Sequence, residues 1–372
     1  MRAYSGRMNF TEVVLRKVNV ALVGAGWWGT NAHIPALKSH PQAECVAVQS
    51  RSLEKARKIA DDFGIRLACT SMDEVLAIQD LDAVIISTTP NMHYEQTKAA
   101  LLAGKHVVLE KPMTITVAQA QELVDIASAR SLHFIISCPW HYNANAIETR
   151  RLIETGALGQ LKMVNILFTN NVAGLYAGER LDKAFRIDAE KHPERVPYRM
   201  PGLSSYSDPA VSGGGHIYTQ ISHVAAMLGF ITQSDPAEVF ARFDNNGAAV
   251  DVFNTIDVKL ANGALVSIAS HGLPMPGDSR WEIRAAGTRG AAEVDLIRGQ
   301  LEFHDIDGQA THYPEPPPAQ RAPATQPAKN LVDVILGLAP NGSPATRGLY
   351  AMKIIEASVK SVQTGANVIV GA

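Results

Sequence analysis

Two short motifs in this chain combine residue types that could carry chemistry. An apolar run over Val18–Val23 leads into Gly24-Ala-Gly26-Trp27-Trp28-Gly29, a G-x-G-x-x-G pattern. About 80 residues later, another apolar run leads into Glu110-Lys111-Pro112. Glycines that follow a strand let the backbone approach a pyrophosphate, and the next helix offers its free N–H groups to the same ligand. With an ammonium group nearby, the two motifs predict redox chemistry on a bound dinucleotide.

Each glycine of the first motif has its own predicted role. Gly24 permits a tight turn, Gly26 leaves room for the pyrophosphate, and Gly29 lets the helix pack closely on the strand. Trp27 and Trp28 stand between them and are expected to line the same cofactor site. The alternative is an ordinary glycine turn. The strand before the motif and the helical segment after it favour the dinucleotide site.

The end of the second expected strand bears on which dinucleotide is bound. An acidic residue there would bind the ribose 2′-hydroxyl and favour NAD. This chain reads Gln49-Ser50-Arg51-Ser52, without an acid. Arg51 could pair with a 2′-phosphate, so Ser50 and Arg51 are predicted to line the cofactor, and NADP is favoured over NAD. The alternative is that Arg51 is a solvated surface charge.

Polar residues also follow the later strands of this region. In an open parallel sheet, ligands bind beyond the carboxyl ends of the strands. One polar stretch comes directly after the apolar run Ala83–Ser87, and the Glu-Lys-Pro motif follows the next run. A structural ion pair of Glu110 is the alternative for that motif. The residues predicted here to line the cofactor are Thr89, Pro90, Asn91, His93, Glu110 and Lys111.

A second polar cluster lies in the stretch from Gly213 to His223, which opens with three glycines. If this stretch is one helix, its polar residues fall within an arc of about 100° and its apolar residues face another way. A polar arc with two histidines suits a substrate cleft, and a solvent-facing stripe is the alternative. The histidines are about 10 Å apart along the axis, so no metal site is expected. The arc comprises His216, Thr219, Gln220 and His223.

The elements that must position these residues alternate regularly over the first third of the chain. Short apolar strands and helical patterns follow one another, which predicts βαβ units and a doubly wound parallel sheet, an α/β Rossmann domain. Strands are expected at Val18–Val23, Cys45–Gln49, Ala83–Ser87, Val107–Leu109 and Phe134–Cys138. Helices are expected at Asn31–Ser39, Leu53–Phe63, Asp73–Ile78, His93–Ala103 and Val117–Ser131.

The second part of the chain reads as an α+β domain with an open, mostly antiparallel sheet. Its strands succeed one another without helices between them, and Asn262-Gly263 is a hairpin signal. A proline-rich stretch over residues 314–327 is expected to be a connector. Helices are expected at Ala144–Thr155, Leu331–Leu338 and Arg347–Gln363. Strands are expected at Leu161–Asn171, Ala237–Phe243, Asp251–Leu260, Leu265–His271, Trp281–Ala286 and Ala292–Leu296.

The segment between Val172 and Gly213 has about 40 residues and little periodicity. Such a long stretch inside a compact domain is usually a lid, a binding loop or disorder. Its mixture of aromatic and polar residues favours a lid, with disorder as the alternative. Tyr206 from this segment is predicted to contact the substrate.

Length and composition limit the class of protein. The chain has 372 residues, 46% of them hydrophobic and 19% charged, which suits two soluble domains. A net charge of −2 gives no reason to expect nucleic acid or a membrane as a partner. Three scattered cysteines predict neither disulfides nor zinc and fit the cytoplasm. No signal peptide or membrane span is expected. The expected division is an extension over 1–16, the Rossmann domain over 17–142, and the α+β domain over 143–372.

Taken together, the motifs resemble the glucose–fructose oxidoreductase, inositol dehydrogenase and MocA family (Gfo/Idh/MocA). The likeness runs from Lys17 to the end of the chain. It rests on the glycine loop, on the Glu-Lys-Pro element, and on the glycine-led segment that carries His223. Two further matching stretches are Gly104-Lys105-His106-Val107 and Gly156-Ala-Leu158-Gly159, and a third is Thr89-Pro90-Asn91-Met-His93.

The resemblance implies a hydride transfer between NAD(P) and a hydroxyl or carbonyl carbon of a sugar, polyol or inositol-like compound. It also implies a homo-oligomer, a dimer or a tetramer, with contacts through the open sheet. Carried onto this chain, Lys111 polarises the reacting oxygen and takes part in proton transfer, and His223 is the second acid/base group. The expected substrate-binding residues are His141, Tyr206, His216, Thr219 and Gln220.

The chain departs from the family pattern at three places, which marks a divergent branch. Thr219 stands where the family commonly has an aspartate, Ile221 where it often has a glycine, and Trp140-His141-Tyr142 where many members have an arginine. A threonine can hydrogen-bond but carries no charge. Two alternatives therefore remain. One is a redox-neutral lyase or hydrolase that uses transient oxidation by tightly bound NAD, and the other is a non-catalytic dinucleotide sensor.

Overall fold

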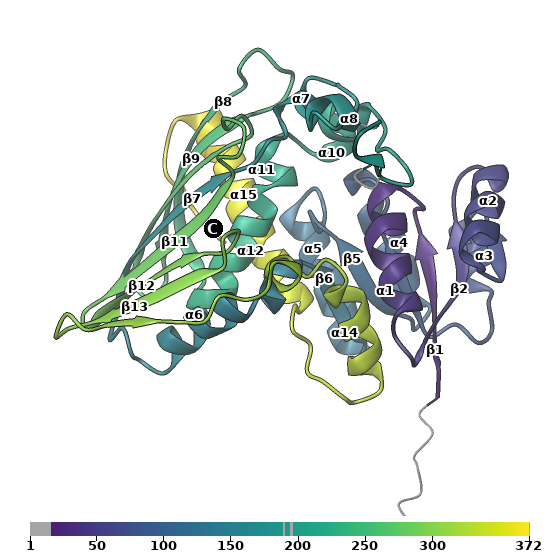
Figure 1. The fold of residues 1–372 in the computed structure, drawn as a ribbon, viewed down its shortest axis with the longest axis horizontal. Helices are drawn as coiled ribbons and strands as arrows, with labels where there is room; N and C mark the ends of the chain where they lie inside the picture. The colour runs from purple at the N-terminus through teal and green to yellow at the C-terminus, as the bar shows by residue number, and fades with distance from the viewer. Residues whose placement is uncertain (1–15, 189, 194–195, 372) are drawn as a thin grey trace, which may run out of the picture.

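The computed structural model describes residues 16–188, 190–193 and 196–371 (Figure 1). Of the expected N-terminal extension only Arg16 is described, and it forms a 2.8 Å ion pair with Asp82. Two sheets organise the chain, one with six strands and one with nine. Among the described residues, no helix is both long and apolar enough to cross a membrane.

The first sheet confirms the predicted doubly wound parallel architecture. Its strand order is β3-β2-β1-β4-β5-β6, and every neighbouring pair is parallel. Alternate residues of the central strand are buried on opposite faces, with Val20 and Leu22 on one side and Ala21 and Val23 on the other. The strands are β1 (Val18–Val23), β2 (Ala43–Gln49), β3 (Leu67–Cys69), β4 (Ala83–Ile86), β5 (His106–Glu110) and β6 (Phe134–Ser137).

The helices that connect these strands are the expected ones, with two differences at their starts: α4 begins at Pro90 rather than His93, and the helix after the glycine motif begins early. The helix expected to start at Asn31 already includes Gly29, because a π-helical turn over Gly29–His33 precedes α1. Pro35 has no N–H for a regular helical bond, which makes such a wider turn compatible with the sequence here. The helices are α1 (Ile34–Lys38), α2 (Leu53–Phe63), α3 (Met72–Leu76), α4 (Pro90–Leu102) and α5 (Val117–Ala129).

The second sheet confirms the expected open, mostly antiparallel arrangement. Its order is β14-β13-β12-β11-β7-β10-β9-β8-β15, and only the β7–β10 pair is parallel among the described strand pairs. The predicted hairpin turn joins β9 to β10, where Gly263 has a φ of +86°. The strands are β7 (Leu161–Thr169), β8 (Pro236–Asp244), β9 (Phe253–Leu260), β10 (Leu265–His271), β11 (Arg280–Gly287), β12 (Gly290–Asp295), β13 (Gln300–Asp305), β14 (Ala310–His312) and β15 (Val368–Ile369).

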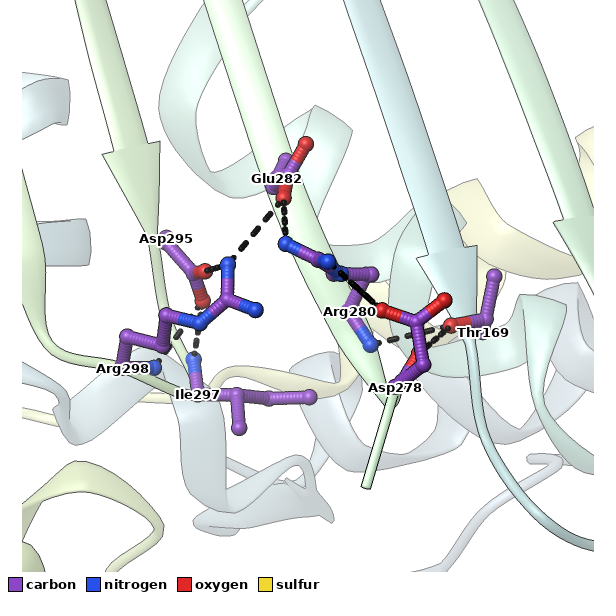
Figure 2. A network of polar contacts seen from close by, with 7 residues as sticks. All are labelled: Thr169, Asp278, Arg280, Glu282, Asp295, Ile297 and Arg298. Atoms are coloured by element: carbon purple, nitrogen blue, oxygen red, sulfur yellow. Dashed lines mark hydrogen bonds and ion pairs between the residues drawn. The ribbon is translucent and has the colours of Figure 1, made fainter. Parts of the chain in front are cut away.

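One face of this sheet is covered by helices and the other is open (Figure 1). Helices α6 (Ala144–Glu154), α12 (Ile221–Thr232) and α15 (Ala345–Thr364) lie on the covered face. On the open face, Arg280 pairs with Asp278 and Glu282, and Arg298 pairs with Glu282 and Asp295 (Figure 2). A groove of about 740 Å³ lies over these charges. Trp281 is buried on the opposite, covered face of the sheet, where its ring lies near His223. The groove is therefore separate from the site around Lys111.

Helix α14 (Gln326–Ile335) belongs to the first core although it comes late in the sequence. Its residues Ala328, Leu331 and Val332 pack with the strand residues of the parallel sheet. The helix begins five residues earlier than expected. Pro327 occupies the first turn, where a missing N–H costs nothing, so the proline-rich stretch ends inside a helix.

The predicted lid segment, residues 172–213, is folded in its described part. It carries the short helices α7 (Ala173–Tyr176), α8 (Leu181–Ala184), α9 (Ser204–Ser207) and α10 (Pro209–Ser212). Its apolar residues form a cluster with Val250 and Val252, the lid cluster, against which Trp27 of the glycine motif packs. Tyr198 packs its ring edge-on against Phe63 and donates its backbone N–H to Asn31. The lid segment thus reaches from the second domain across to the π-helical turn over Gly29–His33 and to α2 of the first.

Candidate active site

The glycine motif has the geometry of a dinucleotide loop. Gly24 has a φ of +87°, and a Cβ there would lie 2.5 Å from Thr88 Cγ2. A Cβ on Gly29 would lie 3.0 Å from Leu22 Cδ2, so Gly29 lets the helix touch the strand. The nearest protein atom to a Cβ on Gly26 is 3.8 Å away. The protein itself does not require a glycine at Gly26, and the open space there fits an approaching pyrophosphate.

At the end of β2 and just after it, some residues support the glycine loop and others are exposed to solvent. Gln49 accepts the N–H of Gly24 with its side chain and donates to the carbonyl of Thr70 at 2.8 Å. Ser52 caps α2 by accepting the N–H of Lys55. Ser50 is partly buried, and Arg51 is exposed at the start of α2. Gln49 therefore holds the glycine loop, while Arg51 is the charge that this edge presents to solvent.

The polar stretch after β4 also has two kinds of residue. Thr89 is the N-cap of α4, and Pro90 is its first residue. The Thr89 hydroxyl donates to Asn91 at 2.7 Å. His93 is fully buried, with its ring nitrogens 2.8 Å from the Pro112 carbonyl and 3.1 Å from the Thr88 carbonyl. The buried His93 ring thus connects the loop after β4 to the loop after β5. Thr89 and Asn91 lie at the carboxyl edge of the sheet.

Glu110 forms a buried pair with His33, whose Nε2 lies 2.8 Å from the carboxylate. Burial pushes the pKa of Glu110 upward, but the hydrogen bond from His33 and the charge of Lys111 outweigh it, so the pKa lies below its ordinary value. The carboxylate is therefore charged beside Lys111. The ion pair, which was the structural alternative for this motif, is present, and it links the π-helical turn after the glycine loop to the end of β5.

Lys111 reaches from the end of β5 to the second domain. Its Nζ donates to the backbone carbonyl of Thr219 at 2.7 Å, and the side chain is partly buried. Burial lowers the pKa of Lys111, and Glu110 offsets part of that effect. An ammonium group with one of its three protons engaged keeps two for a ligand. The Lys111 ammonium of the first domain is thus a hydrogen-bond donor held against the turn at Thr219 in the second domain.

The polar stripe was predicted on one continuous helix, and that prediction is wrong. The structure has two helices, α11 (His216–Thr219) and α12, with a break at Gln220, whose φ and ψ are −125° and −45°. In a continuous helix the Thr219 carbonyl would accept the N–H of His223. Here that N–H bonds to the Gln220 carbonyl at 2.9 Å, and the Thr219 carbonyl is free to accept from Lys111. The stripe is largely buried, which excludes the solvent-facing alternative.

His223 lies beside Lys111 at the start of α12. Burial lowers the pKa of His223 well below its usual range, and the Lys111 and His141 charges lower it further. The ring is partly exposed, and its Nδ1 is buried without a hydrogen-bond partner among the described residues. A neutral imidazole next to an ammonium group can accept a proton that the ammonium helps to release.

The other predicted substrate residues occupy different places. Gln220 accepts from the Asn170 side chain at 2.8 Å. Tyr206 packs against Trp27 within the lid cluster, and burial raises the pKa of its hydroxyl to about 12. His141 is fully buried, contacts Ser343 at 2.8 Å and stacks on Phe230. His141 therefore supports α12 from within, and Tyr206 belongs to the lid cluster.

Two residues of the site were missed by the sequence reasoning. Asp251 is buried and accepts the backbone N–H groups of Gly215 and Ile217 at 2.9 and 2.8 Å, so it caps α11. Tyr176, from the lid segment, lies 2.6 Å from the Thr219 hydroxyl. A single acid between Val250 and Val252 was the available signal for Asp251. No local pattern marks Tyr176, which comes from more than 40 positions away.

Comparisons with known proteins agree with this geometry. Residues 18–137 match the model of an oxidoreductase family with an NAD-binding Rossmann fold, and residues 147–293 match a GFO/IDH/MocA C-terminal domain. A dTDP-3,4-didehydro-2,6-dideoxy-alpha-D-glucose 3-reductase of Streptomyces violaceoruber is 35% identical over 43% of this chain and 46% of its own length. A 1,5-anhydro-D-fructose reductase of Ensifer adhaerens is 31% identical over 59% of this chain and 58% of its own. The chain thus matches about half the length of these relatives.

A solved structure of levoglucosan dehydrogenase in complex with NADH and levoglucosan shares the fold. Its TM-score is 0.78 at 18% identity, over 96% of this chain and 100% of that one. The two matched domain models, the parallel sheet with its glycine loop and the open second sheet lead to one assignment. The chain belongs to the Gfo/Idh/MocA family of oxidoreductases with an NAD-binding Rossmann fold.

Proposed function

We propose that this protein is an NAD(P)-dependent dehydrogenase or reductase that acts on a hydroxyl or carbonyl carbon of a sugar, polyol or inositol-like substrate. The observation that carries the proposal is the Lys111 ammonium, which is held 2.7 Å from the Thr219 carbonyl with His223 beside it. This donor stands beyond the carboxyl end of β5. Strand β5 pairs with β4, and β4 pairs with β1, the strand that leads into the glycine loop. That is where the reactive end of a dinucleotide lies in an open parallel sheet.

The described residues fit a dinucleotide. The space above Gly26 and the first-turn N–H groups after it would hold the pyrophosphate, and Thr89 and Asn91 would line the path from there towards Lys111. When bound, the nicotinamide supplies the hydride chemistry at its C4 carbon. The protein's remaining tasks are to orient the substrate and to move one proton.

Lys111 and His223 divide these tasks by their charge. The protonated Lys111 polarises the reacting oxygen and, in the reductive direction, gives it a proton. In the oxidative direction, the neutral His223 or the deprotonated Lys111 takes the proton of the substrate hydroxyl. Positioned proton transfer of this kind contributes about 10²–10⁴-fold to a rate. The lowered pKa of Lys111 brings its deprotonated form closer to neutral pH, and the lowered pKa of His223 keeps that imidazole neutral.

The test is a survey of sugars, inositols and their keto forms, with the absorbance of the reduced nicotinamide as the readout. We expect Lys111→Met to lower kcat/KM by about 10²–10⁴-fold while dinucleotide binding persists. Lys105→Met is the matched control, because Lys105 also donates to a backbone carbonyl, at 2.8 Å, but precedes the other end of β5. Unchanged activity in Lys111→Met would overturn the assigned role. Substrate conversion without net reduced nicotinamide would instead indicate the redox-neutral alternative.

For the cofactor, we propose NADP in preference to NAD. Arg51 is exposed next to the end of β2, and the acid that would favour NAD is absent from this edge. Arg51→Ala is expected to raise the Kd for NADPH by about tenfold or more and to leave that for NADH nearly unchanged. Equal effects on both nucleotides would contradict the preference. Arg57→Ala, an exposed arginine inside α2 and further from β2, is the control.

We further propose a homo-oligomer, a dimer or a tetramer, in the cytoplasm. The nine-stranded sheet offers a broad open face, and three free cysteines suit a reducing compartment. Light scattering after size-exclusion chromatography tests the oligomeric state, and a monomer at micromolar concentration would contradict it.

A further inference from the structure

A short chain of buried hydrogen bonds connects the lid segment to the turn that receives Lys111. Thr219 Oγ1 lies 2.9 Å from the Gly215 carbonyl oxygen and 2.6 Å from the Tyr176 hydroxyl. The Tyr176 hydroxyl also lies 3.3 Å from His216 Nδ1. His216 and Tyr176 are 0% and 1% exposed, so no water competes for these contacts from outside.

The directions of these hydrogen bonds depend on where the Thr219 hydroxyl proton lies. We assign it to the Gly215 carbonyl oxygen, which lies 2.9 Å away and can only accept. Thr219 Oγ1 can then only accept from Tyr176, which uses the single proton of that hydroxyl. The Tyr176 oxygen is left as an acceptor towards His216. The proton between them must therefore sit on His216 Nδ1.

The charge states agree with this direction. Burial raises the pKa of Tyr176 well above its ordinary value, so its hydroxyl keeps its proton. Burial, with the His271 and Lys111 charges, lowers the pKa of His216 to about 3, so the ring is neutral. A neutral imidazole carries one proton only. With that proton on Nδ1, Nε2 is a bare acceptor, and it has no partner among the described residues.

We propose that Tyr176 is a positioning residue that fixes His216 as the neutral Nδ1–H tautomer and thereby leaves Nε2 as an unpartnered hydrogen-bond acceptor. Thr219 directs this arrangement because its hydroxyl accepts the Tyr176 proton. The backbone carbonyl of the same residue accepts from Lys111. The site then presents a donor, Lys111, and an acceptor, His216. If the proposed function holds, on which this last step rests, the pair suits a neutral polyhydroxy compound better than a carboxylate or a phosphate at His216.

The test is the tautomer itself, which needs neither substrate nor cofactor. Long-range ¹H–¹⁵N spectra of the protein labelled at histidine distinguish the two tautomers, because the unprotonated ring nitrogen resonates well downfield of the protonated one. The His216 signals are identified by their loss in His216→Asn. We expect wild-type His216 to carry its proton on Nδ1 at neutral pH. A proton on Nε2 would overturn the proposal.

Three variants separate positioning from simple packing. Tyr176→Phe removes the acceptor of the Nδ1 proton, and Thr219→Val leaves Tyr176 free to donate to Nδ1, so both should shift the proton to Nε2. Thr219→Ser keeps the hydroxyl and should keep the wild-type tautomer. Tyr198→Phe removes another hydroxyl from the lid segment and should leave His216 unchanged. An unchanged tautomer in both Tyr176→Phe and Thr219→Val, with the fold intact by circular dichroism, would refute the chain.

A kinetic measurement then tests the role in binding. With any substrate that the activity survey yields, Tyr176→Phe should raise KM by about 2- to 10-fold, the range of one hydrogen bond, with a smaller change in kcat. Absence of any activity would count against the proposed function and leave the tautomer result to decide the proposal. A shifted tautomer with an unchanged KM would overturn the assignment of His216 Nε2 as a substrate acceptor.

Discussion

Two glycines of one motif should respond differently to the same methyl group. At Gly24, a φ of +87° costs alanine about 1–2 kcal/mol. The new Cβ would also lie 2.5 Å from Thr88 Cγ2 and 2.7 Å from the Ser87 carbonyl carbon, an overlap that costs about 1–3 kcal/mol. Gly24→Ala should therefore lower the free energy of unfolding by about 2–5 kcal/mol.

At Gly26 the same change has another consequence. The nearest protein atom to the new Cβ is the Ser87 carbonyl oxygen, 3.8 Å away, which is an ordinary contact. The free energy of unfolding should change by no more than about 1 kcal/mol. The methyl group would instead stand where the pyrophosphate approaches the backbone. We expect the affinity for NADH and NADPH to fall by at least about tenfold, or about 1.4 kcal/mol.

Two assays on the same preparations separate these effects. Urea unfolding followed by circular dichroism measures the free energy of unfolding, and nucleotide fluorescence titration measures the Kd. Wild-type nucleotide affinity in Gly26→Ala would refute the assignment of this loop to the cofactor. Equal destabilisation by both variants would refute the steric reasoning, since only Gly24 touches the end of β4.

Three further predictions concern the residues around Lys111. Because burial lowers its pKa, kcat/KM for reduction should fall as pH rises through a value below the ordinary lysine range, and Lys111→Arg should lose this limb in a pH–rate profile if it stays active. Asp251→Ala leaves two buried N–H groups at the start of α11 without acceptors and should lower the free energy of unfolding by about 2–5 kcal/mol; a change within 0.5 kcal/mol in urea unfolding would contradict the cap. His33→Ala leaves the Glu110 carboxylate without its 2.8 Å partner and should cost a similar amount, whereas His40→Ala, whose partner Asp333 is partly exposed, should cost less than about 1 kcal/mol in the same measurement.

The parallel sheet could be predicted from the sequence because its signal is local. Five of its six strands were predicted as short apolar runs that alternate with helical periods, and the three-residue strand β3 was missed. The exposed strand β14 and the two-residue strand β15 carry no such period, so they were missed. Their pairing depends on partners distant in the sequence, which no local pattern records.

The polar cluster shows where local reasoning stops. The helical spacing of His216, Thr219 and His223 predicted one polar stripe on a single helix, whereas the structure divides these residues between α11 and α12. It did not predict the break at Gln220, because the break depends on contacts made across the domain boundary. Lys111, from another domain, takes the Thr219 carbonyl, and Asp251 holds the other end of α11. A helical wheel drawn for residues 213–223 includes neither Lys111 nor Asp251, so it cannot predict the break.

The sequence by itself determined the two domain types and the glycine loop, because these follow from the periodicity of single strands and helices and from the spacing of three glycines. The tertiary structure alone decided that Thr219 meets Lys111 through its carbonyl rather than its side chain. It also decided that Tyr176 of the lid segment supplies the contact to the Thr219 hydroxyl. Hydrogen bonds of this kind have short range and definite direction, so they depend on how separate segments are placed in space, which spacing along the chain does not specify.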